Sequence, residues 1–187
     1  MANLCVPDGI GIVIASKILG GGIKHRVAGI ELIEALFRKM SEDGRTCRVF
    51  LLGGKPGVAE RAKERLEQTY SALEVVGVYD GYFDSSQERQ IAEHIGQTKP
   101  DVLLVGLGFP KQEEFIDRNR AVLEAKVCIG CGGSIDVFAG EVMRAPVVFR
   151  KVGLEWLYRL IKQPSRLRRM SVLPIFIIKV LGYRRAT

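Results

Sequence analysis

Residues 48–54 read RVFLLGG, a nearly continuous apolar run that ends in two glycines. The same pattern returns in three later segments, which read VVGVY at 75–79, DVLLVGLG at 101–108 and KVCIGCGG at 126–133. Short apolar runs bounded by turn signals are typical of strands that are buried on both faces, and such strands are found in parallel sheets. The sequence therefore predicts a mostly parallel sheet that contains these four segments.

Segments with helical periodicity alternate with the predicted strands. Apolar side chains recur at three- and four-residue spacing within 30–40, 58–69, 91–95 and 115–123. Ser85 and Glu88 are predicted to form a capping box ahead of the third helix, and Asn119 is the one polar residue on the apolar face of the fourth. The alternation predicts the α/β class, as a Rossmann-like three-layer domain with right-handed crossovers.

The basic residues are concentrated at the carboxyl end of the chain. The 187 residues carry 28 Lys and Arg against 21 Asp and Glu, a net charge of +7. Eleven of the basic residues but only one acidic residue, Glu155, lie within 144–187, so this segment alone carries +10. A field of one sign favours a polyanionic partner, which on this ground alone is a nucleic acid, an anionic membrane surface or a phosphorylated substrate.

Two apolar segments lie within this basic region. Residues 152–163 predict an amphipathic helix that ends at Pro164 and turns inward the side chains of Leu154, Leu157, Leu160 and Ile161. Residues 171–181 are apolar almost throughout and are broken by Pro174 and Lys179. This second segment is too short to span a bilayer. Its composition fits either a helix in a membrane interface or one that docks onto the domain or a partner chain.

Length and composition fit one domain with a small appendage. Hydrophobic residues make up 47% and charged residues 26% of the chain, which excludes a disordered or fibrous protein. The change in pattern predicts a Rossmann-like domain at 1–145 and a helical, basic, membrane-associating appendage at 146–187. The four cysteines are too few and too unevenly spread for a disulfide framework, so a reducing compartment suits them.

Glycines gather at the carboxyl ends of the predicted strands. They are Gly53, Gly54, Gly106, Gly108, Gly130, Gly132 and Gly133. Ligands of open α/β sheets bind outside these strand ends, where glycine lets the backbone approach a phosphate. A nucleotide site is one interpretation, and tight turns that need glycine are the other. Neither a dinucleotide fingerprint nor a P-loop motif is present.

Metal-binding patterns are weak. Cys128 and Cys131 form a CxxC inside a predicted strand, and no second pair supplies the remaining ligands of a zinc site. The sequence also contains no DxD pair of the kind that holds a divalent cation in many nucleotide-sugar enzymes. We therefore expect no metal site.

Nine short motifs, in order along the chain, resemble those of the WecG/TagA/CpsF glycosyltransferases. They are PDGIGI (7–12), HRVAG (25–29), FLLGGKPG (50–57), GYF (81–83), VGLGFPKQE (105–113), GGSIDVFAG (132–140), RAP (144–146), LEWLYRL (154–160) and KQPSRLRRM (162–170). The resemblance covers nearly the whole chain. It implies transfer of N-acetylmannosamine, or a related sugar, from a UDP donor to GlcNAc-diphospho-undecaprenol in teichoic-acid or surface-polysaccharide synthesis.

The resemblance also implies roles for individual residues. Asp8 is expected to be the general base in a single displacement with inversion, and Arg26 and Gln112 are expected near the acceptor or the diphosphate. Arg159, Arg166 and Arg169 are expected to neutralise the leaving nucleotide in place of a cation, so no cofactor is implied beyond the UDP-sugar. Weaker nucleotide-side expectations fall on Asp136 and on Gly53, Gly54, Gly106, Gly108, Gly132 and Gly133.

Partners and location follow from the same resemblance. The enzyme is expected at the cytoplasmic face of the bacterial plasma membrane, as a peripheral protein that binds a UDP-sugar, a polyprenyl-diphosphate acceptor and anionic lipid but no nucleic acid. A homo-oligomer is compatible with the sequence. Family members usually carry a further segment ahead of PDG, with additional strands and a Thr-x-Asn element, so activity is expected of that full-length form.

Two alternatives remain open from the sequence. One is a non-catalytic remnant that binds a nucleotide sugar without turnover. The other is a basic nucleic-acid-binding protein, for which the appendage offers charge but, close together, only Trp156 and Tyr158 as stacking aromatics.

Overall fold

The computed structural model describes residues 2–146, 148–149, 154–162 and 172–186. These residues form two compact units. The first unit, residues 32–143, contains the whole sheet, and the second consists of residues 2–31 together with the described parts of 144–187. The boundary falls inside α2 (Gly29–Glu42), whose first turn belongs to the second unit.

Four parallel strands form the sheet of the first unit. They are β1 (Cys47–Gly53), β2 (Leu73–Tyr79), β3 (Val102–Gly106) and β4 (Val127–Gly130), in the spatial order β2-β1-β3-β4. All four predicted strands and their parallel direction are confirmed. The prediction that the strands are buried on both faces is wrong for the two edge strands, because Val127 of β4 is 46% exposed and residues 76–79 of β2 are only partly buried.

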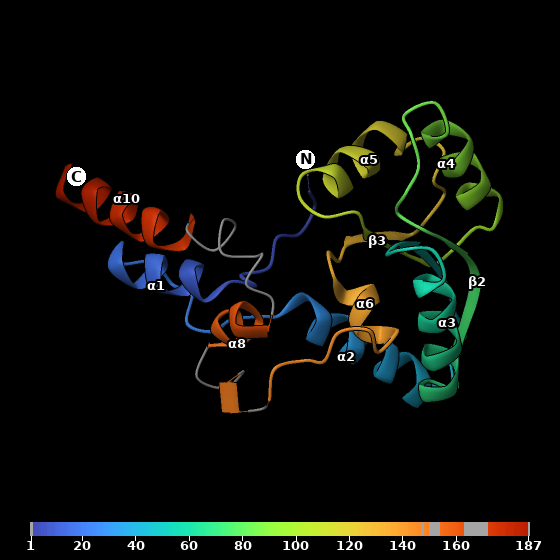
Figure 1. The fold of residues 1–187 in the computed structure, drawn as a ribbon, viewed down its shortest axis with the longest axis horizontal. Helices are drawn as coiled ribbons and strands as arrows, with labels where there is room; N and C mark the ends of the chain where they lie inside the picture. Colours follow the sequence, from blue (N-terminus) through green and yellow to red (C-terminus); the bar gives the residue numbers. More distant parts are fainter. Residues whose placement is uncertain (1, 147, 150–153, 163–171, 187) are drawn as a thin grey trace. The chain divides into compact units, whose positions relative to one another are not determined.

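Helices cover both faces of the sheet, which confirms the three layers (Figure 1). Residues of α2, α3 (Val58–Thr69) and α6 (Ser134–Phe138) share one core with the side chains of Val49 and Leu51. On the opposite face, α4 (Glu88–Gln97) and α5 (Lys111–Asn119) share a second core with Phe50 and Leu52. Successive β1 side chains point to opposite faces, so one apolar run supplies both cores.

The capping box predicted at Ser85 and Glu88 does not form, because the N-cap of α4 is Gln87 and no side chain caps it. In the turn that precedes the helix, the Asp84 carboxylate accepts hydrogen bonds from the backbone N–H groups of Ser86 and Gln87. The side-chain oxygen of Gln87 in turn accepts a 3.1 Å hydrogen bond from the backbone N–H of Asp84. These reciprocal hydrogen bonds fix the turn from which α4 starts. Glu88, the first residue of α4, has partners on α5 instead.

Three helices make up most of the second unit. They are α1 (Ile10–Ile18), α8 (Glu155–Lys162) and α10 (Val172–Ala186). α1 and α10 pack against each other (Figure 1), and α1 is a helix that the sequence patterns did not predict. No helix in the described ranges is both long and apolar enough to cross a membrane.

One prediction for this unit is wrong in part. Leu154 and Ile161 do not point inward, since they are 37% and 65% exposed. Pro174 is the third residue of α10, where a proline costs no internal hydrogen bond.

Candidate functional site

A pocket of about 750 Å³ opens at the carboxyl ends of β1, β2 and β3. The chain runs from β1 outward to β2, then crosses back to β3 on the other side of β1, so the strand order changes direction between β1 and β3. This switch point is where open α/β sheets bind their ligands. The pocket is lined by Gly54, Lys55, Gly81, Tyr82, Phe83, Asp84, Gln87, Gly106, Leu107, Lys111 and Asp136.

Glycine is required where the strand ends meet. A Cβ added at Gly53, which has φ +141°, would lie 2.7 Å from the carbonyl oxygen of Gly106. A Cβ added at Gly106 would lie 2.8 Å from the carbonyl oxygen of Gly132. The three backbones therefore pack directly on one another beside the pocket, which no larger residue would allow.

The segment 80–87, which follows β2, supplies much of the pocket wall. The backbone N–H of Gly81 donates to the carbonyl oxygen of Gly54, and that of Tyr82 donates to the Asp80 carboxylate. Hydrogen bonds from the Ser86 hydroxyl and from backbone N–H groups lower the pKa of Asp84, which stays ionised while it holds the turn. Tyr82 presents its ring at the wall and is 69% exposed.

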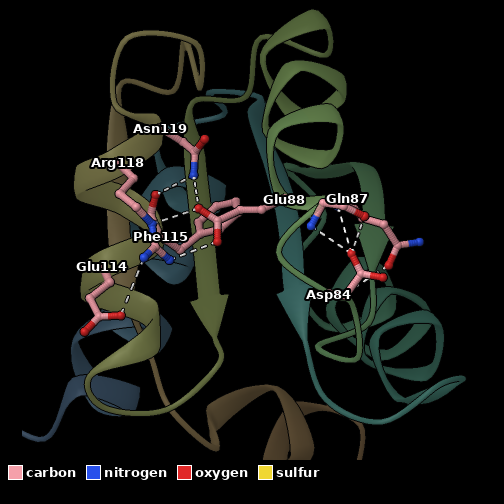
Figure 2. A network of polar contacts seen from close by, with 8 residues as sticks. Asp84, Gln87, Glu88, Glu114, Phe115, Arg118 and Asn119 are labelled. Atoms are coloured by element: carbon pink, nitrogen blue, oxygen red, sulfur yellow. Dashed lines mark hydrogen bonds and ion pairs between the residues drawn. The ribbon is translucent and has the colours of Figure 1, made fainter.

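A polar network ties the start of α4 to the end of α5 (Figure 2). Arg118 donates to both carboxylate oxygens of Glu88, at 3.0 and 2.9 Å. The side-chain amide of Asn119 donates to the same carboxylate. Glu88 directly follows the turn at Asp84–Gln87, and α5 begins at Lys111, so the network joins helices that start at the wall of the pocket.

Two lysines line the pocket, together with the carboxylate residues Asp84 and Asp136. Lys55 follows the two glycines that end β1, and Lys111 is the first residue of α5. Both are exposed, as a side chain that meets a soluble ligand must be. Sequence reasoning quoted the motifs that contain them but missed the two residues. The signal that could have found them is a base directly after a strand end on each side of the switch point.

The predicted nucleotide-side residues divide into two groups. Gly54, Gly106 and Asp136 line the pocket, and Gly53 supports it from behind. Gly108, Gly132 and Gly133 lie in the adjoining loops and do not line it.

Gln112 is buried rather than presented to solvent. It is 7% exposed, and its side-chain oxygen accepts a 3.0 Å hydrogen bond from the backbone N–H of Gly132. Its side-chain nitrogen donates at 2.8 Å to the carboxylate of its neighbour Glu113.

Asp8 lies in the second unit, directly ahead of α1. Its segment is anchored by a 3.0 Å hydrogen bond from the backbone N–H of Val27 to the carbonyl oxygen of Pro7. The carboxylate is exposed, and its Oδ2 atom would lie 3.6 Å from a Cβ built on Gly29, the first residue of α2. An exposed carboxylate on a fixed backbone is available to accept a proton.

Arg26 belongs to the same group of segments. Its guanidinium contacts the carboxylate of Glu155 at 3.1 Å, and the two side chains are 17% and 9% exposed. Glu155 is the first residue of α8, so this ion pair joins the HRVAG segment to the appendage. Sequence reasoning gave Glu155 no role.

The predicted tail arginines are only partly visible. Arg159 lies in α8, but its side chain is outside the described part of the chain, and Arg166 and Arg169 lie outside the described residues altogether.

The CxxC pair carries no metal-binding geometry. Burial raises the pKa of the Cys131 thiol to about 12 and also raises the pKa of Cys128, so both stay protonated at neutral pH. Within the residues that the structure describes, no group of three or more His, Cys, Asp or Glu side chains could hold a metal ion.

Comparison with known proteins places this fold and site in a family. The profile of the "Glycosyl transferase WecG/TagA/CpsF family" matches residues 1–187. A Bacillus spizizenii protein named N-acetylglucosaminyldiphosphoundecaprenol N-acetyl-beta-D-mannosaminyltransferase is 39% identical over 186 residues, which are 100% of this chain and 71% of the relative. A Staphylococcus aureus protein of the same name is 39% identical over 184 residues, 98% of this chain and 71% of that relative.

Proposed function

The chain belongs to the WecG/TagA/CpsF family of glycosyl transferases, and we propose that it transfers N-acetylmannosamine from UDP to GlcNAc-diphospho-undecaprenol. The observation that carries this proposal is the match along the whole chain to relatives that are named for that transfer. The pocket at the sheet's switch point supports it independently, because its position and its two lysines suit a nucleoside diphosphate.

The UDP-sugar is proposed to bind in the pocket of the first unit. Lys55 and Lys111 are the cations that line it, and they would pair with the diphosphate. Tyr82 offers an exposed ring on which a uracil can stack. Because these lysines and the tail arginines supply positive charge for the leaving group, we propose that transfer requires no divalent cation.

Asp8 is proposed to be the general base. In the proposed step the acceptor hydroxyl gives its proton to the Asp8 carboxylate while its oxygen bonds to the anomeric carbon. The bond from that carbon to UDP breaks, and UDP leaves with the electron pair. A single displacement of this kind inverts the anomeric centre, since no second carboxylate acts as a nucleophile.

The appendage is proposed to serve both the leaving group and the membrane. Arg159, Arg166 and Arg169 would neutralise charge on the departing diphosphate, and the net charge of +10 within 144–187 favours an anionic lipid surface. We propose peripheral binding at the cytoplasmic face of the plasma membrane, where the undecaprenol-linked acceptor is anchored.

A product analysis tests this function. The protein is incubated with a short-chain GlcNAc-diphospholipid and, in separate reactions, with UDP-N-acetylmannosamine, UDP-N-acetylglucosamine, UDP-glucose and the uronic acid of UDP-N-acetylmannosamine. The expected result is one N-acetylhexosamine added only from UDP-N-acetylmannosamine, at an unchanged rate in EDTA. UDP binding without transfer from any donor would refute the proposed activity, and a rate that EDTA abolishes would refute its metal independence.

A further inference from the structure

Gln112 is a buried polar residue in the first turn of α5, on the same buried face as Phe115 and Asn119. It is 7% exposed, and both ends of its amide are engaged. The oxygen is held by the backbone N–H of Gly132 and the nitrogen by the carboxylate of Glu113. A buried amide with its strongest bonds already made is suited to holding structure rather than to meeting a substrate.

Gly130 packs directly against the side-chain amide of Gln112. A Cβ added at Gly130 would lie 2.6 Å from the Gln112 side-chain nitrogen and 3.0 Å from its Cδ atom. Gly130 ends β4, and its φ is not in the left-handed region, so its backbone alone does not require glycine. What glycine provides at this position is room for the Gln112 side chain.

The loop that Gln112 holds is connected to the pocket at two points. The carbonyl oxygen of Gly132 lies against Gly106, where an added Cβ would come within 2.8 Å of it, and Gly106 lines the pocket. Farther along the same loop and α6, Asp136 also lines the pocket. On the other side of the contact, Lys111 precedes Gln112 and carries one of the two pocket cations.

We infer that Gln112 is a positioning residue, which fixes the loop between β4 and α6 to the start of α5 and so maintains the pocket that binds the UDP part of the donor. The inference rests on the proposed function, because it concerns the donor site. It differs from substrate contact by Gln112, which the sequence resemblance implies, and the two roles predict different kinetics.

A matched pair of variants approaches the contact from its two sides. Gln112→Ala removes the amide, and Gly130→Ala displaces it by adding one methyl group to a residue that does not line this pocket. Positioning predicts that each raises the Kd for UDP and the donor KM by roughly three- to tenfold, the value of one hydrogen bond, while the acceptor KM is unchanged. Because both variants break the same contact, the double variant should be no worse than either single one.

An exchange of two neighbouring side chains provides the rescue test. Gln112→Glu alone keeps an acceptor for the Gly132 N–H but places a carboxylate against that of Glu113. Adding Glu113→Gln restores a donor for that carboxylate, so both hydrogen bonds can form again. If Gln112 is a positioning residue, the double variant Gln112→Glu/Glu113→Gln should recover the UDP affinity that Gln112→Glu alone loses, although position 112 then carries a carboxylate in place of an amide.

Gly22→Ala is the control for the glycine substitution. Nothing lies within 4 Å of a Cβ at Gly22, so this variant should bind UDP as the unsubstituted protein does. Thermal unfolding of every variant separates a local change from loss of the fold. Should Gln112→Ala fail to fold, Gly130→Ala and the exchanged pair still decide the question.

Three results would overturn the inference. They are a raised acceptor KM in Gln112→Ala with normal UDP affinity, a normal Gly130→Ala, or an exchanged pair as defective as Gln112→Glu alone. UDP affinity is measured by calorimetry without turnover. A protein that binds UDP but transfers no sugar would therefore refute the proposed function and leave this comparison intact.

Discussion

The side-chain amide of Asn119 donates a 2.9 Å hydrogen bond to the carboxylate of Glu88, 31 residues earlier in the chain. Asn119 is 4% exposed and is the polar residue that interrupts the apolar face of α5. Its amide also donates to the carbonyl oxygen of Phe115, so both N–H donors of a buried side-chain nitrogen are used at the junction of two helices. The interruption in the apolar pattern is thus a link between α4 and α5.

This link predicts the effect of Asn119→Leu on stability. Leucine has a similar size but leaves the buried side of the Glu88 carboxylate without this donor, so the free energy of unfolding should fall by about 1–3 kcal/mol. Urea denaturation measures the change. Arg118→Ala is the comparison, because the Arg118 side chain is 57% exposed. Removing this exposed partner of Glu88 should lower the free energy of unfolding by only about 1 kcal/mol or less. Equal losses in the two variants would show that the buried amide is not the important donor.

The two pocket lysines are expected to contribute to UDP binding through their charge. Lys55→Gln and Lys111→Gln each remove a cation that lines the pocket, and each should weaken UDP binding by roughly tenfold or more, the value of a charge-assisted hydrogen bond. Lys39→Gln is the control, since Lys39 lies on the exposed surface of α2 and pairs only locally with Asp43. Isothermal titration with UDP gives the three affinities. Unchanged affinity in both pocket variants would place the diphosphate elsewhere.

Asp101 predicts a specific dependence of stability on pH. Lys126 lies 2.6 Å from its carboxylate and the backbone N–H of Arg48 donates to it, so the pKa of Asp101 is lowered, first by the Lys126 hydrogen bond. A carboxylate with a lowered folded-state pKa adds stability above its unfolded-state pKa, and this stability is lost as pH falls through the folded-state pKa.

The variant Asp101→Asn should therefore be less stable than the unsubstituted protein at pH 7, and the difference should shrink as pH falls below about 4. Denaturation at several pH values checks the trend. Glu60→Gln, on the exposed surface of α3, should follow the unsubstituted protein at every pH. A difference that stays constant from neutral to acid pH would mean that the charge of Asp101 contributes nothing.

The sheet was predictable because its signals are local. Each strand is a short apolar run that stops at a glycine or turn, and the alternating side chains of β1 fill both cores. The helix α1 was missed for the opposite reason. Its sequence, IGIVIASKI, is rich in β-branched residues and has little polar periodicity, so it reads neither as an amphipathic helix nor as an alternating strand.

The site was less predictable because it depends on contacts distant in sequence. Gly54 and Gly106 were found from their place at strand ends, but Lys55 and Lys111 become a pair only through the strand order β2-β1-β3-β4. The capping box predicted at Ser85 and Glu88 failed for the same reason, because the Glu88 carboxylate is bound by Arg118 and Asn119, about 30 residues later in the chain.

Turnover of Asp8→Asn is the decisive test of the Asp8 carboxylate as general base. It is measured with UDP-N-acetylmannosamine and a short-chain GlcNAc-diphospholipid, beside Asp43→Asn as the same chemical change at an exposed residue just after α2. If the Asp8 carboxylate removes the proton from the acceptor, kcat should fall by about 10²- to 10⁴-fold with UDP affinity unchanged, while Asp43→Asn keeps its rate. Full turnover by Asp8→Asn would show that the Asp8 carboxylate is not the general base.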